Sequence, residues 1–182
     1  MTKKLIGSAD LTPSSDSGFD LDTKGQIHGY TSTQYALDVG NDSDILVCDS
    51  GEASGLKYTA NTTSFVLACS DESTAIDSTG TKVTFRMPFA YIVTAVRASL
   101  TTAGTGANLF TVDISEGGTT ILSTKITIDA TETTSVTAAT APVIDDPDLA
   151  DDAQMTIDVD QLDSGGVAAG LKVYIIGYRV AH

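Results

Sequence analysis

The sequence predicts an all-β protein, an antiparallel β-sandwich of jelly-roll type preceded by an extended N-terminal arm. Within residues 81–129 apolar side chains recur at every second position, which is the period of a strand with one buried face. Thr, Ser, Gly, Ala and Asp dominate the remaining composition, which suits strands and tight turns rather than helices. No apolar stripe with helical spacing persists along the chain.

Residues 1–64 are predicted to form the arm. Their apolar residues come in short pieces separated by polar clusters such as SSDSGFDLD and GNDSD. Fixing the backbone of each residue costs about 1–2 kcal/mol, and pieces this short bury too little apolar surface to offset that cost. We therefore expect the arm to be ordered on other subunits, through its apolar and aromatic side chains: Leu5, Ile6, Leu21, Ile27, Tyr35, Leu37, Val39, Ile45, Val47, Leu56 and Tyr58.

The sandwich is predicted over residues 65–182, and three strands are expected before residue 101. FVLAC is a short apolar run, typical of a strand buried on both faces. TKVTFRM and the segment 91–100 follow after a polar break, and both alternate. The side chains expected on their buried faces are Val83, Phe85 and Met87, then Ile92, Val96, Ala98 and Leu100.

The remaining strands are predicted at shorter intervals. They cover residues 108–115, 119–123 and 125–129, and the Thr-rich piece TETTSVTAAT is expected to add an edge strand. In the next segment Met155, Ile157 and Val159 alternate with polar residues, and the final run LKVYIIGYRV is apolar on both sides, which indicates a central or interface strand. About eight short strands, spaced by roughly 8–12 residues, are typical of a sandwich or jelly roll.

The charge and cysteine content exclude several classes of protein. The net charge is −14, from 24 acidic and 10 basic residues, and no basic cluster exceeds Lys3-Lys4, so a direct nucleic-acid partner is not expected. Two cysteines, Cys48 and Cys69, fit neither a disulfide framework nor a zinc site and are interpreted as small apolar residues. No segment resembles a signal peptide or a membrane span, so we expect synthesis in a cytoplasm without membrane insertion.

The sequence contains no recognisable catalytic motif, and neither an enzyme nor a cofactor is expected. His28 and His182 are the only histidines, so a Ser-His-Asp or Cys-His arrangement is not credible. One acidic loop is the densest carboxylate cluster, but it lacks the glycine and the closing glutamate of a calcium-binding EF-hand loop. A solvated surface is the favoured interpretation over a metal site for its five aspartates: Asp145, Asp146, Asp148, Asp151 and Asp152.

The last strand carries a second group of candidate contact residues. Tyr174, Ile176 and Tyr178 fall on one face of it. Two interpretations stay open at this point: the three side chains line the core, or they form an exposed apolar ridge that marks an interface.

Several segments resemble a small β-sandwich module of tailed-bacteriophage structural proteins. They are TKVTFRMPFA, VRASLTTAGTGANLFTVDI, GTTILSTKITIDATETTS, LADDAQMTIDVDQ and GLKVYIIGYR. Upstream, ALDVG at residues 36–40 and GLKY at residues 55–58 resemble the ALPVG-like and GLKW-like pieces of a linker that precedes distal domains of phage fibres, with Tyr58 where Trp is usual. The similarity covers residues 35–180.

The resemblance implies a virion protein that assembles on the particle surface, as a homotrimer. An arm of only 64 residues suits attachment to a capsid better than a long fibre, so the first hypothesis is a capsid decoration (cement) or short head-fibre protein bound to the major capsid protein. The second is a tail-fibre or receptor-binding module, in which sandwich loops such as TTAGTG contact the host surface.

Overall fold

The chain divides into two compact units, unit 1 (Met1–Asn61) and unit 2 (Thr62–His182). The computed structural model describes residues 27–30, 34–38, 40–41 and 44–180, with the backbone alone for 27–30 and 34–36. The division follows residue 61, where residue 64 was predicted, because strand β5 (Thr62–Ala68) pairs with the last strand from its first residue onward.

The described part of unit 1 forms two antiparallel hairpins. β1 (Ile27–Tyr30) pairs with β2 (Gln34–Leu37), and β3 (Asp44–Cys48) pairs with β4 (Leu56–Ala60). The second hairpin, formed by β3 and β4, is called the 3–4 hairpin, and it closes through a hydrogen bond of 2.8 Å from the Asp49 backbone N–H to the Gly55 carbonyl. These residues were predicted as an extended arm, and they pair because two short pieces of matching length follow each other along the chain in each hairpin.

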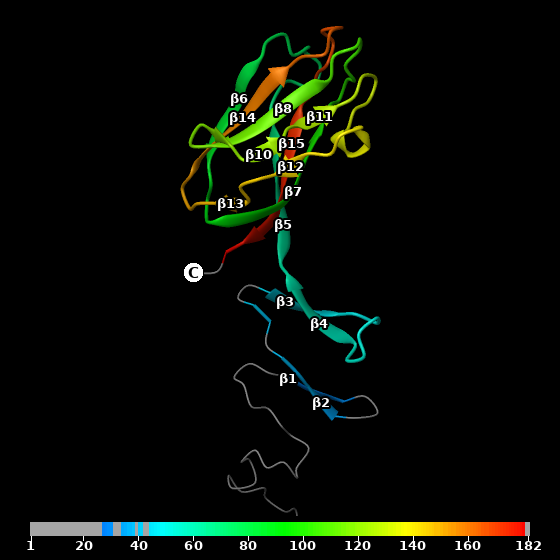
Figure 1. Cartoon of the computed structure of the whole chain (residues 1–182), viewed down its shortest axis with the longest axis vertical. Helices are drawn as coiled ribbons and strands as arrows, with labels where there is room; N and C mark the ends of the chain where they lie inside the picture. The colour runs from blue at the N-terminus through cyan, green and yellow to red at the C-terminus, as the bar shows by residue number, and fades with distance from the viewer. Residues whose placement is uncertain (1–26, 31–33, 39, 42–43, 181–182) are drawn as a thin grey trace, which may run out of the picture. The chain divides into compact units, whose positions relative to one another are not determined.

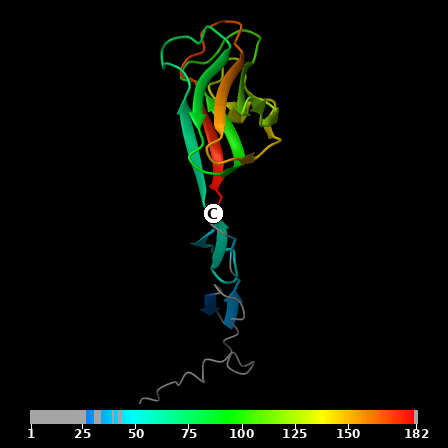
Figure 2. The same cartoon turned by 90° about the vertical axis from the view of Figure 1, so that its left-hand side faces the viewer.

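Unit 2 contains two larger antiparallel sheets (Figures 1 and 2). The strands of the first sheet lie in the order β13-β7-β15-β5, and those of the second in the order β11-β8-β14-β6, with β9 added to β8. A short pair, β10 with β12, lies outside both. The bounds are β6 (Gly80–Arg86), β7 (Tyr91–Ser99), β8 (Phe110–Glu116), β9 (Thr119–Thr120), β10 (Leu122–Thr124), β11 (Ile126–Ile128), β12 (Val143–Ile144), β13 (Asp148–Leu149), β14 (Gln154–Gln161) and β15 (Lys172–Arg179).

The connectivity of these sheets confirms the predicted sandwich. The chain passes from one sheet to the other between β5, β6, β7 and β8, and it does so again between β13, β14 and β15. Each of the last two strands enters between strands formed much earlier in the chain, which is the Greek-key arrangement of a jelly roll. The final strand is a central one, as its apolar character on both faces predicted.

The core between the two sheets is mostly aliphatic. Phe110, Val112 and Ile114 of β8 are at most 1% exposed, and the three alternating residues of β14, Met155, Ile157 and Val159, are fully buried. The alternation read from the sequence is therefore confirmed for these strands. Tyr91 is also fully buried, and its hydroxyl donates a hydrogen bond of 2.9 Å to the Thr63 carbonyl.

Two strand predictions are corrected. β5 was predicted to be buried on both faces, but it is an edge strand and Val66 is 56% exposed. In β7 the alternation changes phase at a register shift opposite Ile176 and Gly177, so that Val93 is buried and Ile92 is only half-buried. Such a bulge inserts one residue and turns the following side chains to the other face.

The Thr-rich edge strand was also wrong. Residues 135–137 form a short 3-10 helix, η2 (Ser135–Thr137), capped by a hydrogen bond of 3.2 Å from the Val136 backbone N–H to Thr134 Oγ1. Thr and Ser side chains compete for backbone donors in this way, which favours caps and turns over a ladder. The hydroxyl of buried Ser135 then accepts the Ala98 backbone N–H at 2.9 Å.

Candidate interaction surfaces

The two linker-like pieces of the sequence meet where Gly40, which precedes β3, contacts Tyr58 of β4. Tyr58 lies against Gly40 so closely that a Cβ atom at residue 40 would be 2.6 Å from the ring atoms Cγ and Cδ1. The residue that ends ALDVG and the aromatic residue of GLKY are therefore direct neighbours. A salt bridge between Lys57 and Asp49 ties the strand to its turn.

The hairpin register separates the predicted contact residues into two groups. Leu46 lies opposite Tyr58, and Ile45 lies opposite Thr59, so Ile45 and Val47 are on the other face from Leu56 and Tyr58. Leu46, which sequence reasoning missed, joins Leu56 and Tyr58 and is 38% exposed, while Ile45 is 42% exposed. Both faces of this small sheet therefore carry partly exposed apolar side chains.

The other predicted arm contacts are only partly described. Leu5, Ile6, Leu21 and Val39 lie outside the described residues. The backbones of Ile27 and Tyr35 belong to β1 and β2, and Leu37 is half-buried at the end of β2.

The structure places Tyr174, Ile176 and Tyr178 on the outer face of the first sheet. Their neighbours along β15, Val173 and Ile175, are fully buried in the core, whereas the three themselves are half-buried. Of the two interpretations left open by the sequence, the partly exposed ridge matches this arrangement. In the adjacent strands Tyr174 lies between Val66 and Arg97.

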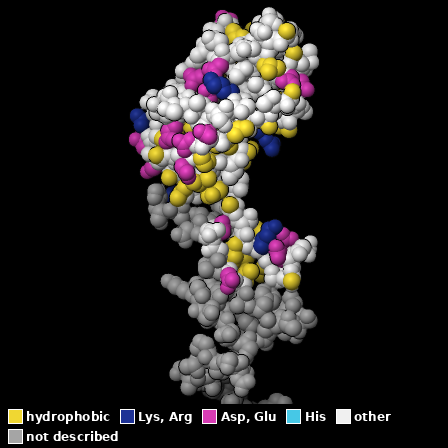
Figure 3. Space-filling view, in the orientation of Figure 1, with side chains coloured by type: hydrophobic (Ala, Val, Ile, Leu, Met, Phe, Trp, Pro, Cys, Tyr) yellow, Lys and Arg dark blue, Asp and Glu magenta, His cyan; other side chains and the backbone are white. Residues whose placement is uncertain are grey.

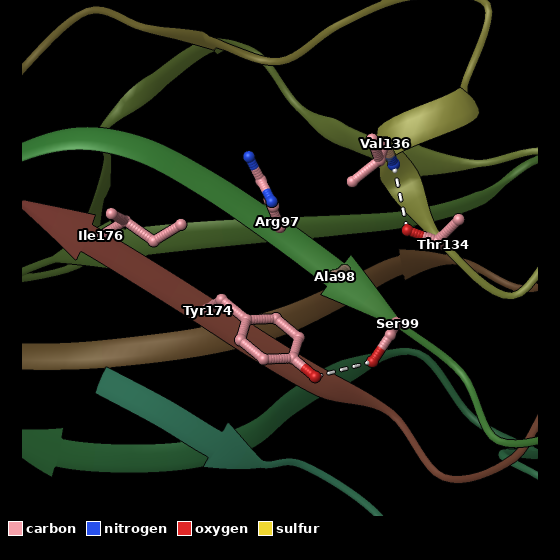
Figure 4. A pocket seen from close by; sticks show the side chains of 7 residues that line it. All are labelled: Arg97, Ala98, Ser99, Thr134, Val136, Tyr174 and Ile176. Atoms are coloured by element: carbon pink, nitrogen blue, oxygen red, sulfur yellow. Dashed lines mark hydrogen bonds between the residues drawn. The ribbon is translucent and has the colours of Figure 1, made fainter. Parts of the chain in front are cut away.

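A shallow hollow of about 210 Å³ opens beside this ridge (Figure 4). It is lined by strand residues of β7 and β15 and by the segment before and within η2: Arg97, Ala98, Ser99, Thr134, Val136, Tyr174 and Ile176. The Tyr174 hydroxyl lies 3.3 Å from Ser99 Oγ. Arg97 is exposed, and no other described residue forms an ion pair or hydrogen bond with its guanidinium group.

The acidic loop is a solvated surface in this structure. All five of its aspartates are exposed, and Asp152 lies 3.6 Å from Arg86. Among the residues that the structure describes, no group of three or more His, Cys, Asp or Glu side chains is arranged to hold a metal ion. Acidic and hydrophobic side chains both gather at the end of unit 2 that carries β13 (Figure 3).

Asp163 holds together the loops at the opposite end of unit 2, and no sequence motif indicated this role. It is 4% exposed, and its carboxylate accepts backbone N–H groups from Thr105 at 2.9 Å and from Val167 and Ala168 at 3.4 Å. Burial alone favours the neutral acid, but these donors together outweigh it and hold the pKa of Asp163 below its ordinary value. The loops 101–108 and 163–170 are thereby fixed to each other.

The two cysteines are free and differ in environment. Cys69 is buried, and burial raises the pKa of its thiol to about 11, so it behaves as the predicted small apolar residue. Cys48 is exposed on β3, which corrects the same prediction for that residue.

No protein-family model matches the chain, and no curated protein matches it significantly. In the described part of the chain, no helix is long and apolar enough to cross a membrane.

The geometry therefore offers three surfaces for interaction. They are the 3–4 hairpin with its two apolar faces, the outer face of the β13-β7-β15-β5 sheet, and the loop end that Asp163 organises. The first two are apolar and suit protein contacts, whereas the third is polar and rigid.

Proposed function

We propose that this chain is a structural protein of a tailed-bacteriophage particle, a capsid decoration (cement) or short head-fibre protein. Residues 1–64 attach it to the major capsid protein and to neighbouring copies, and residues 65–182 form the sandwich. The protein is located on the virion surface, after synthesis in the host cytoplasm. It acts without catalysis, cofactor or metal, and without inserting into a membrane or binding nucleic acid directly.

The observation that carries the proposal is the contact between Gly40 and Tyr58. The linker resemblance rests on two short sequence pieces, and an accidental similarity gives no reason for them to touch. Here the glycine of ALDVG leaves the space that the aromatic ring of GLKY fills. The pieces thus behave as one packing motif, directly before a β-sandwich, which supports the resemblance.

The hairpins of unit 1 support an oligomer. An isolated two-stranded sheet is marginally stable at best in water, and both faces of the 3–4 hairpin expose apolar side chains. Neighbouring copies of the chain would cover those faces, and we propose a homotrimer. Burial across many such joints raises the free energy needed to open the shell.

The test is the copy number of the chain relative to the major capsid protein in purified particles, measured by quantitative mass spectrometry. A ratio near one or near a simple fraction supports lattice-wide decoration. A few copies to a few tens per particle would place the chain at the tail or the vertices. Complete absence from the particle overturns the proposal.

A deletion tests the assignment of the arm. A chain lacking residues 1–30 is expected to keep the folded sandwich and to lose binding to particles, measured by co-sedimentation with shells stripped of the protein. If the shortened chain still occupies shells fully, those residues do not attach it.

A second candidate function is receptor binding, and the loop end of unit 2 favours it. Loops 101–108 and 163–170 are fixed to each other by Asp163 and by a hydrogen bond of 2.7 Å from the Gly165 backbone N–H to the Thr105 carbonyl. Rigid loops on a β scaffold are a common setting for recognition. Saturable binding of the purified chain to host cells, lost when loop 101–108 is exchanged for an unrelated turn, supports this candidate.

A further inference from the structure

The outer face of the β13-β7-β15-β5 sheet carries several partly exposed apolar side chains. Cross-strand rows join Val66, Tyr174 and Arg97, then Ser64, Ile176 and Ala95, then Thr62, Tyr178 and Ile92. We call this the β5–β15–β7 surface and define it by its apolar side chains and its one central cation: Val66, Ile92, Tyr174, Ile176, Tyr178 and Arg97.

The edges of the two sheets differ in how they are protected against pairing with a strand of another chain. On the side of β7 that faces away from β15, β13 and short segments satisfy the backbone. The Val93 N–H donates to the Pro147 carbonyl, the Ala98 N–H to the Ser135 hydroxyl, and the Leu100 N–H to the Thr133 carbonyl. The edge strand β6 carries Lys82 and Arg86, which discourage pairing with another strand. These are ordinary means of protecting a sheet edge.

Strand β5 lacks the charged residues that β6 carries. Its sequence TTSFVLA contains no charge and no proline, it pairs in regular register with β15 over its whole length, and no strand pairs with its other edge among the described residues. An uncharged, regular edge strand is a template for association with another chain. Its exposed Val66 belongs to the apolar face, so edge and face form one continuous surface.

The charge of this surface is opposite to that of the protein. The chain has a net charge of −14, yet β5, β7 and β15 contain no Asp or Glu and contribute Arg97, Lys172 and Arg179. Lys172 is paired with Glu72 at 2.6 Å, and Arg179 lies 5.0 Å from the centre of the Phe89 ring. Arg97, at the rim of the hollow, has no such partner among the described residues (Figure 4).

We propose that the β5–β15–β7 surface binds a second copy of this chain and that Arg97 pairs there with a carboxylate of the neighbouring copy. Each copy carries exposed aspartates for this role in the loop 145–152. Contact between a ridge on one copy and a loop on the next is heterologous, and such contacts close into rings, including trimers. This inference rests on the homo-oligomer of the proposed function and names the face that forms it.

The second copy is the occupant that the chain itself indicates. A single residue, Asn61, separates β4 from β5, and the 3–4 hairpin needs a neighbour for its own stability. Each unit by itself therefore presents partly exposed apolar side chains that a second copy would cover. Tyr and Arg are also enriched in the cores of protein interfaces, whereas Lys, Glu and Asp are depleted there.

Sedimentation velocity of the full chain over a range of concentrations tests the proposal. Ile176→Asp introduces a charge in the middle of the surface, and Arg97→Glu reverses the central cation. Each is expected to raise the dissociation constant of the oligomer by about tenfold or more, as for a central interface residue. The matched control is Thr84→Asp, on the exposed face of edge strand β6, and it should leave the oligomer unchanged.

Photo-crosslinking gives a second measurement that does not depend on the stability of these variants. With p-benzoylphenylalanine at residue 66, irradiation should yield crosslinked dimers of the chain, and with the same group at residue 84 it should not. If the oligomer persists in both surface variants and crosslinks form at other residues, the β5–β15–β7 surface is not the interface, while the homo-oligomer of the proposed function is retained. If the chain is monomeric at all concentrations, both the interface and the homo-oligomer are rejected. Its presence in the virus particle is tested separately, by the copy number. Crosslinks at residue 66 to a different virion protein overturn the choice of a second copy.

Discussion

At Gly177, strand β15 crosses the bulge of β7 with no space for a side chain. A Cβ atom there would lie 2.8 Å from Tyr91 Cε1 and closer still to the carbonyl oxygen of Ile92. The oxygen belongs to the backbone of a central strand, so it cannot move without disturbing the ladder. The glycine is required by a close approach of two strands.

We therefore expect Gly177→Ala to destabilise unit 2 by about 3 kcal/mol, the upper part of the range for overpacking a core. Urea unfolding followed by circular dichroism measures the change. Gly117→Ala is the control, because its φ is +56° and no atom lies within 4 Å of its Cβ position, so only the left-handed backbone penalty of about 1–2 kcal/mol applies. Equal losses in both variants would contradict the close-approach argument.

Asp163 gives a prediction that depends on pH. The unfolded carboxyl has a pKa of about 3.9, and the folded one titrates lower. Its stabilising contribution is therefore complete above the unfolded value and is lost as the pH falls through the folded value. Asp163→Asn should cost about 1–3 kcal/mol at pH 7, and its difference from the wild type should shrink below about pH 4.

Thermal unfolding of both proteins at several pH values measures this difference. Asp146→Asn, at an exposed loop position, is the control and should show no such trend. A difference between wild type and Asp163→Asn that stays constant from pH 7 to pH 3 would show that the charge on Asp163 does not matter.

The short helix η2 takes the place of a strand beside β7, on the side that faces away from β15. Buried Ser135 supplies one hydroxyl where a strand would supply a carbonyl. Ser135→Ala leaves the Ala98 backbone N–H without a partner, and we expect a loss of about 1–3 kcal/mol. Hydrogen exchange of the Ala98 amide should accelerate together with this loss, and an unchanged exchange rate would refute the role of the hydroxyl. Ser123→Ala, at an exposed position, serves as the control.

The strands whose buried residues the sequence predicted correctly have one face packed in the core that the two sheets share. In β8 and β14 the alternation of apolar and polar residues follows directly from burial, so the core residues could be identified from period alone. The bulge in β7 was not predictable, because nothing in the strand itself marks the residue at which the phase changes.

The candidate surfaces were less predictable than the core. β5 is apolar enough for a central strand, and only its place in the sheet order shows that it is an edge. Asp163 accepts its shortest hydrogen bond from Thr105, which lies 58 residues away in the sequence, in a loop brought near by the fold. The ridge on β15 was predicted as one of two alternatives, since a period of two separates faces and does not say which one is the core.

Unit 2 has a core of its own, whereas we expect unit 1 to need a packing partner. Both sheets of unit 2 close around a shared core within residues 62–180, whereas the described part of unit 1 consists of hairpins of two strands each. A fragment of residues 62–182 is therefore expected to fold alone, with one cooperative thermal transition. A fragment of residues 27–61 is expected to lack such a transition, because a single hairpin is marginal without a packing partner.

Circular dichroism and calorimetry of the two fragments measure these outcomes, with the full chain as the reference. If unit 1 is ordered by neighbouring copies, the full chain should show a second transition whose midpoint rises with protein concentration, because association is coupled to the order of the hairpins. A cooperative, concentration-independent transition in the 27–61 fragment would show that the hairpins need no neighbour. That result would leave the β5–β15–β7 surface as the remaining structural support for the oligomer.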